Sequence, residues 1–197
     1  MRYLSKNSQS VIITNNWKYT NSGHRPKIRQ VLIQEQQGYC AYSEKYISPT
    51  HASEIEHFDD RKKKTVNDNY WNWYAVLRKM NQIKMGKKIK NYMPILDPHD
   101  PQVSQRIYYK AGQFQTVQPG DIEAQNLINF LGWNSPTLAR EREGFINRMK
   151  QDRSRFFSNN TQDFIDYLKD KERPDNLSFI TALEIELGIK LLSLIHI

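Results

Sequence analysis

A glutamate is followed by a histidine, two asparagines and a lysine, residue types that suit phosphodiester chemistry. Glu56 and His57 are adjacent, Asn72 comes 15 residues after His57, and Asn81 and Lys84 follow. Hydrolysis of a phosphodiester needs a base that activates water and a divalent cation held by hard oxygen ligands. Histidine is the usual base because its pKa lies near neutrality, and carboxylate and carboxamide oxygens suit the cation. These residue types indicate a metal-dependent nuclease site.

The positive charge of the chain is concentrated around these residues. The net charge is +8, and the window from Arg61 to Lys90 holds ten basic residues and a single acid, Asp68. The window therefore carries +9 and the rest of the chain −1. Such a local field suggests a polyanionic partner, either nucleic acid or an anionic membrane face, and on charge alone a solvated lysine-rich surface is an equal alternative. The predicted nucleic-acid contacts are Lys62, Lys63, Lys64, Lys84, Lys87 and Lys88.

The elements that must position the site are predicted as a strand, a loop and a helix. Ser53 to Phe58 alternates in polarity, which predicts a strand. Asp59 to Asn69 is polar and basic and predicts a loop. Tyr70 to Met85 has apolar residues at helical spacing and is followed by glycine, which predicts a helix. Adjacent strand residues point to opposite faces, so Glu56 and His57 can act together only if the strand twists or ends there.

The rest of the chain predicts an α+β protein. Residues 1–22 contain one β-like run, Val11 to Ile13, and Pro26 to Gln37 predicts a helix. A glycine-containing turn predicts a small hairpin over residues 107–117. From residue 119 the pattern is helical, with helices predicted at Asp121 to Leu131, Ser135 to Phe157, Thr161 to Lys171 and Ser178 to Leu191.

Length and composition set the class of protein. The chain has 197 residues, 38% of them hydrophobic and 25% charged, which suits a folded domain with a sizeable core. No run approaches the roughly 20 apolar residues of a membrane span, and no signal peptide is expected. The single cysteine, Cys40, excludes an internal disulfide. It suits a reducing cytosol, so a cytoplasmic location is expected.

The order of these residues resembles the HNH, or ββα-metal, endonucleases. That motif has an acid-histidine pair at a strand end, a central asparagine, and an asparagine or histidine followed by a nearby lysine. The flanking segments Gln36 to Glu44 and Ile95 to Pro98, together with a helix ending in Leu-Gly-Trp-Asn, are similar to PtuB. PtuB is the HNH nuclease subunit of Septu and retron-associated anti-phage systems. The similarity covers roughly residues 25–150.

The resemblance implies a role for each matching residue. His57 would be the general base. Glu56 and Asn81 would hold Mg²⁺ or Mn²⁺. Asn72 would fix the loop that orients the His57 ring, and Lys84 would contact a phosphate. The implied fold is a ββα-metal core with a flanking N-terminal helix and a C-terminal helical extension.

The resemblance also implies domains and partners. Residues 1–118 would form the nuclease module, with its core at about 38–92. Residues 119–191 would form the helical extension, interpreted either as the docking surface for an ATPase of the SMC/ABC type, similar to PtuA, or as completion of the core. Residues 192–197, LSLIHI, look like a translated sequencing adaptor and are set aside as non-native.

Two departures from the family concern metal ligands. Many relatives carry a structural zinc on two Cys-x-x-Cys pairs, and here the corresponding positions are Cys40, Ser43, Leu77 and Met80. One thiolate cannot close a tetrahedral zinc site, so no structural zinc is expected. Asp59-Asp60 stands where relatives have Pro-Lys; either acid could assist the metal, and we favour the interpretation that both are exposed loop acids.

Three functions agree with these residues. The favoured one is an HNH endonuclease that cuts DNA as the effector of an anti-phage system. The first alternative keeps the fold but cuts RNA, such as a host tRNA. The second is a non-catalytic module that grips nucleic acid through its basic and aromatic residues. Loss of cleavage but not of binding in His57→Ala and Asn81→Ala would separate the last from the others.

Overall fold

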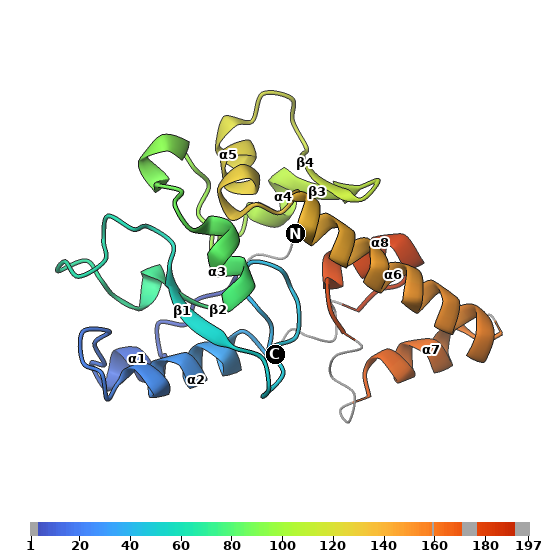
Figure 1. Cartoon of the computed structure of the whole chain (residues 1–197), viewed down its shortest axis with the longest axis horizontal. Helices are drawn as coiled ribbons and strands as arrows, with labels where there is room; N and C mark the ends of the chain where they lie inside the picture. The colour runs from blue at the N-terminus through green and yellow to red at the C-terminus, as the bar shows by residue number, and fades with distance from the viewer. Residues whose placement is uncertain (1–3, 159, 171–176, 192–197) are drawn as a thin grey trace.

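The protein is a mixed α+β structure. The computed structural model describes residues 4–158, 160–170 and 177–191. Within these ranges it has eight α-helices and two small antiparallel sheets of two strands each (Figure 1). None of the described helices has the length and apolar character to cross a membrane. In chain order the elements are α1 (Val11–Thr14), α2 (Arg25–Glu35), β1 (Ser53–His57), the 3₁₀ turn η1 (Tyr70–Asn72), β2 (Trp73–Leu77), α3 (Arg78–Lys84), the 3₁₀ turn η2 (Ile89–Tyr92), α4 (Val103–Arg106), β3 (Ile107–Lys110), β4 (Gln113–Thr116), α5 (Ile122–Leu131), α6 (Pro136–Phe156), α7 (Thr161–Leu168) and α8 (Ile180–Leu187).

The first sheet sets the position of the candidate site. β1 and β2 pair antiparallel, with His57 opposite Trp73 at one end. All five residues of β2 are buried. Its outer edge does not lie open, because the Gln36 amide accepts from the Ala75 N–H and donates to the Ala75 carbonyl, at 2.8 Å in each case. The Ala41 N–H donates to the same carbonyl. The end of α2 and the segment after it therefore close this sheet.

The helix predicted from Tyr70 to Met85 is wrong in its first half. Residues 70–72 form η1, residues 73–77 form β2, and only Arg78–Lys84 is α-helical. The physical reason is burial on both faces of β2. A strand covered on both sides is a continuous apolar run, and periodicity alone cannot separate it from a buried helix. The loop between the two strands and the strand at 53–57 were predicted correctly.

Most of the other predicted elements are confirmed. The hairpin β3–β4, the helix α2 and the helices α5 and α6 lie where the sequence placed them, and the Asp121 side chain caps α5 by accepting from the Ala124 N–H. α7 and α8 are shorter than predicted. The β-like run at Val11 is a short helix, since Ser10 caps it through the Ile12 N–H.

The C-terminal helices share one apolar core with the sheet. The buried hydrophobic cluster runs from Leu4 to Leu191. Glu44, before β1, accepts 2.8 Å hydrogen bonds from both the backbone N–H and the hydroxyl of Thr181 on α8. The described helices after residue 119 thus contribute to this core, and surface for docking remains on their exposed sides. Residues 192–197 lie outside the described residues.

Candidate active site

A cleft of about 420 Å³ lies between α2 and β1. β1 supplies Glu54 and Glu56 to it, two residues apart and so on the same face of the strand. α3 supplies Asn81, and the opposite wall carries cationic side chains of α2. Three oxygen-bearing side chains from two elements therefore meet in one concave site. The lining residues are Tyr19, Ser22, Arg25, Pro26, Arg29, Ser53, Glu54, Ile55, Glu56, Lys63 and Asn81.

Each acid on the floor of the cleft has a cationic or amide partner. The Asn81 Nδ2 donates to Glu54 Oε2 at 2.7 Å, and Arg78 Nε donates to Glu54 Oε1 at 2.7 Å. The hydrogen bond from Asn81, followed by Arg78, keeps the pKa of Glu54 below its ordinary value. The Lys84 ammonium pairs with Glu56 and also donates to the His57 carbonyl at 2.7 Å. The two carboxylates are thus held in place and locally neutralised.

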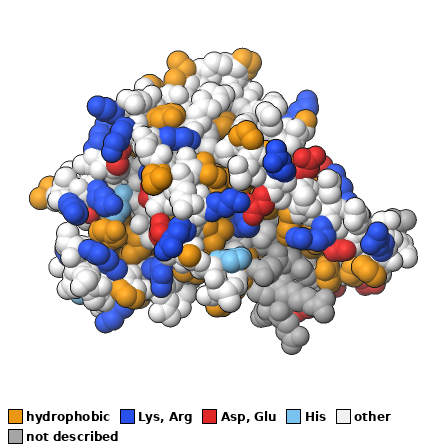
Figure 2. All heavy atoms as spheres, in the orientation of Figure 1, with side chains coloured by type: hydrophobic (Ala, Val, Ile, Leu, Met, Phe, Trp, Pro, Cys, Tyr) orange, Lys and Arg blue, Asp and Glu red, His pale blue; other side chains and the backbone are white. Residues whose placement is uncertain are grey.

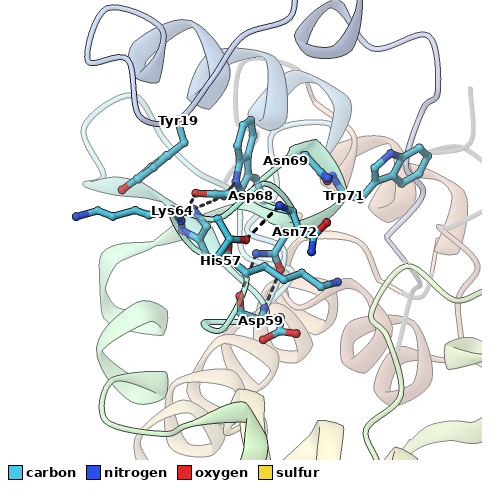
Figure 3. A network of polar contacts seen from close by, with 12 residues as sticks. Tyr19, His57, Asp59, Lys64, Asp68, Asn69, Trp71 and Asn72 are labelled. Carbon is cyan, nitrogen blue, oxygen red and sulfur yellow. Dashed lines mark hydrogen bonds and ion pairs between the residues drawn. The ribbon is translucent and has the colours of Figure 1, made fainter.

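His57 points away from this cleft, as a regular strand requires. Its side chain is 4% exposed, and it packs against Trp73 and under the ring of Tyr19, whose centroid lies 4.4 Å from that of the imidazole (Figure 3). Tyr19 also lines the cleft. β1 ends at His57, but this end does not bring His57 into the cleft that Glu56 and Asn81 line, so the predicted convergence of the three side chains is not seen.

Asp68 is the residue that sequence reasoning missed. Its Oδ1 lies 3.0 Å from His57 Nε2, a contact with the length of a hydrogen bond but not its alignment. The same oxygen accepts from Trp73 Nε1 at 2.5 Å. Its other oxygen accepts from the Lys64 N–H at 2.7 Å. A signal was present, because Asp68 is the one acid in the basic window. Glu54 was also missed, and its signal was the two-residue spacing from Glu56.

The imidazole of His57 is neutral at pH 7. Burial lowers its pKa from 6.5 to about 4, the nearby Asp68 opposes that change, and Lys63 and Lys84 add to it. A neutral imidazole can accept a proton, which is the requirement for a general base.

Asn72 braces the loop that follows β1. Its side-chain oxygen accepts from the Asp59 N–H at 2.8 Å, and its side-chain nitrogen donates to the Asp59 carbonyl at 3.0 Å (Figure 3). The Asn72 carbonyl accepts from the Phe58 N–H. Asn72 is buried, so both polar ends of its amide are satisfied by this loop. This geometry fits the role the resemblance implied, that of fixing the backbone beside His57.

The expectation that both Asp59 and Asp60 are exposed is wrong. Asp59 is 5% exposed and accepts from the Arg61 guanidinium, which lowers its pKa. Asp60 accepts from the Ile89 N–H at 3.0 Å and lies 3.6 Å from Lys88. Both acids therefore serve the local structure of the loop, since backbone and cationic donors surround them.

The predicted lysines fall into two groups. Lys62, Lys63, Lys64 and Lys88 are exposed. Lys84 is buried against Glu56, and Lys87 donates to the carbonyls of Asn129 and Phe130. Figure 2 shows Lys and Arg side chains gathered over the half of this face that carries α2, α3 and the loop between β1 and β2.

The four positions that the resemblance pairs with zinc ligands are all buried. Cys40 is buried, and its sulfur accepts from the Leu77 N–H at 3.3 Å. Ser43, Leu77 and Met80 are also buried. Apolar packing and the N–H···S contact between Leu77 and Cys40 therefore join the β1–β2 sheet to the turn that precedes it.

The donors of the cleft fit a hard divalent cation in chemical type. Glu56 and the His57 carbonyl already share one cation, the Lys84 ammonium. Within the described residues, no group of three or more His, Cys, Asp or Glu side chains is arranged to hold a metal ion. The oxygen donors of the cleft are Glu54, Glu56 and the Asn81 carboxamide, which are of the hard type that Mg²⁺ accepts.

No family model matches the chain, and no curated protein or solved structure is significantly similar to it.

Proposed function

We propose that the chain is a metal-dependent endonuclease of the HNH, or ββα-metal, type. The observation that carries the proposal is the succession β1, braced loop, β2 and α3. It places Glu56 and Asn81 in one cleft, sets His57 at the end of β1, and lets Asn72 hold the loop between them. The basic surface around the cleft supports a polyanionic substrate.

In this proposal Glu56 and Asn81 hold Mg²⁺ or Mn²⁺, and Glu54 adds a carboxylate to the same face. When bound, the ion would stabilise the charge that develops on the phosphate and on the leaving oxygen. Lys84 would exchange its contact with Glu56 for a phosphate oxygen.

His57 acts as the base that takes a proton from the attacking water. Its low pKa keeps the imidazole neutral, and Asp68 faces Nε2. A proton on Nε2 would lie on the side of that carboxylate, and the lone pair of Nδ1 would be left for the water. The ring of Tyr19 must swing off the imidazole for water from the cleft to reach it, because Tyr19 covers His57 at 4.4 Å.

DNA is the favoured substrate, and RNA is the alternative with the same chemistry. The experiment incubates the purified protein with DNA and with RNA in Mg²⁺ or Mn²⁺. Cleavage is expected to disappear in Glu56→Gln, His57→Ala and Asn81→Ala. His51→Ala and Asn147→Ala are matched controls because both residues are exposed and lie outside the cleft. Binding without any cleavage by the unaltered protein would favour the non-catalytic module.

The proposed setting is an anti-phage system in the cytoplasm with an SMC/ABC-type ATPase partner. It is supported by the resemblance in sequence. The exposed sides of the C-terminal helices, where Phe156 is 72% and Ile185 is 51% exposed, leave apolar surface for such a partner. Co-purification with an SMC/ABC-type ATPase tests it, and loss of the complex in Phe156→Asp and Ile185→Asp is expected.

A further inference from the structure

The two walls of the cleft differ in how their charges are balanced. On the floor, Glu54 is paired with Arg78 and Glu56 with Lys84. On the opposite wall the basic residues are Arg25 and Arg29 of α2, with Lys63 from the loop after β1. Among the ion pairs of the described residues, none involves these three cations. The wall therefore carries uncompensated positive charge toward a floor whose acids are already neutralised.

Each of the two arginines is held at the cleft by a hydrogen bond that leaves most of its N–H donors unpaired. Arg25 Nε donates to the Tyr19 carbonyl at 2.8 Å, and its guanidinium lies 4.8 Å from the centre of the Tyr19 ring. Arg29 Nη1 donates to the Ser53 carbonyl at 3.2 Å. A guanidinium has five N–H donors, so most of the donors of each side chain remain for a ligand. Both side chains are exposed at the mouth of the cleft.

The spacing along α2 suits neighbouring phosphates of one strand. Arg25 and Arg29 are four residues apart and lie one above the other on the same helix face. Their separation along the axis is about 6 Å. Guanidinium groups bind phosphate with paired N–H···O bonds, which suits them better to this task than isolated lysines. Ile28 and Leu32, each three residues after one of the arginines, are buried beside them and fix the helix against the core.

We propose that the cleft between α2 and β1 is the channel for the phosphodiester backbone. Arg25 and Arg29 hold phosphates of the nucleic-acid strand that would be cut on the Glu56 side of the cleft. Lys63 contacts the same strand from the loop. This rests on the proposed function, because it places the substrate in the same cleft. It differs from the lysine-rich surface predicted from sequence in that the decisive cations come from α2.

The test measures binding in the absence of divalent ions, so that cleavage does not enter. Fluorescence anisotropy with a labelled 20-mer is recorded for single-stranded DNA, duplex DNA and single-stranded RNA over a range of salt. In Arg25→Gln/Arg29→Gln the dissociation constant is expected to rise at least about tenfold near 0.1 M salt. The slope of log K against log salt should fall by about 1.4 to 1.8, since each phosphate contact contributes about 0.7 to 0.9.

Two further variants distinguish loss of the phosphate contacts in the cleft from a change in net charge and from a folding defect. Arg140→Gln/Arg155→Gln removes the same charge from exposed positions of α6 and should change binding less than about twofold. Arg25→Lys/Arg29→Lys keeps both charges while losing the Nε bond to Tyr19, and should retain most of the salt slope. The DNA and RNA arms identify which backbone the channel prefers.

The outcomes are distinct. Equal weakening by the α2 and α6 pairs overturns the proposal, as does unchanged binding of the α2 variant, and cleavage by the unaltered protein would still uphold the nuclease. Selective loss in the α2 pair without any cleavage upholds the channel and refutes the nuclease. An unaltered protein that binds none of the three nucleic acids, or that binds only phosphatidylserine vesicles, overturns the channel.

Discussion

Acidification from pH 7 to pH 5 should destabilise the protein chiefly through His57. The folded pKa is about 4 and the ordinary value is 6.5. Between these values the unfolded chain binds more protons than the folded one, so the free energy of unfolding falls as pH falls through 6.5, and the loss approaches completion near pH 4. A tenfold change in a protonation constant is worth about 1.4 kcal/mol, which gives a loss of about 2 kcal/mol between pH 7 and pH 5.

This range of pH separates His57 from the carboxylates. The pKa values of Glu54, Asp59 and Asp121 are all lowered in the folded state, by the side-chain hydrogen bond of a neighbour in each case. A lowered carboxylate pKa contributes stability that is lost mainly below about pH 5. Compared with these carboxylates, the histidine is therefore the group whose contribution changes between pH 7 and pH 5.

The assay is urea unfolding at pH 7, 6 and 5 for the unaltered protein and for His57→Gln. Glutamine has no titration in this range, so the difference between the two unfolding free energies should shrink by about 2 kcal/mol as pH falls to 5. His51→Gln is the control, because His51 is exposed. Parallel curves would refute the neutral buried imidazole. A gain in stability on acidification would show instead a charged pair between His57 and Asp68.

Three further predictions concern contacts around the site. Asp68→Asn should lower the turnover number by about 10²-fold or more and move the acid limb of the pH–rate profile to lower pH, because the carboxylate that faces Nε2 and raises the His57 pKa is gone. Gly132→Ala should destabilise by about 2 to 4 kcal/mol in thermal unfolding, since Gly132 has φ +68° and a Cβ there would overlap Ile83 of α3. Gly144→Ala, where nothing lies within 4 Å inside a helix, should be neutral or slightly stabilising. The unfolding free energy should rise from pH 7 to pH 9, because burial lowers the pKa of Lys6 from 10.5 to about 7 and the folded protein releases that proton first; Lys6→Met should remove the rise, and a flat curve in the unaltered protein would contradict the burial.

The sequence predicted the positions of the site residues better than their surroundings. The alternation around Glu56 and the polar loop after it located β1 and its end, and α3 with Asn81 and Lys84 began where apolar residues gave way to polar ones. β2 was lost in the predicted helix because its five residues are buried on both faces and show no alternation.

Long-range contacts explain the rest of what sequence alone left out. Tyr19 covers His57 from a segment 38 residues earlier in the chain, and no local pattern indicates such a contact. Arg25 and Arg29 lie outside the basic window, in the part of the chain whose net charge is close to zero, so net charge did not single them out. Asp68 and Glu54 could have been found from the sequence. Asp68 is an isolated acid in the basic window, and Glu54 falls on the same alternating positions as Glu56.

The hydrogen bonds between Glu44 and α8 also bear on the order in which the protein matures during synthesis. Glu44 is 2% exposed, and its carboxylate receives both the N–H and the hydroxyl of Thr181, 137 residues later. A nascent chain that has not yet produced α8 would leave this acid beside the turn before β1 without those donors. The turn before β1 therefore reaches its final packing only after the chain has been made through α8.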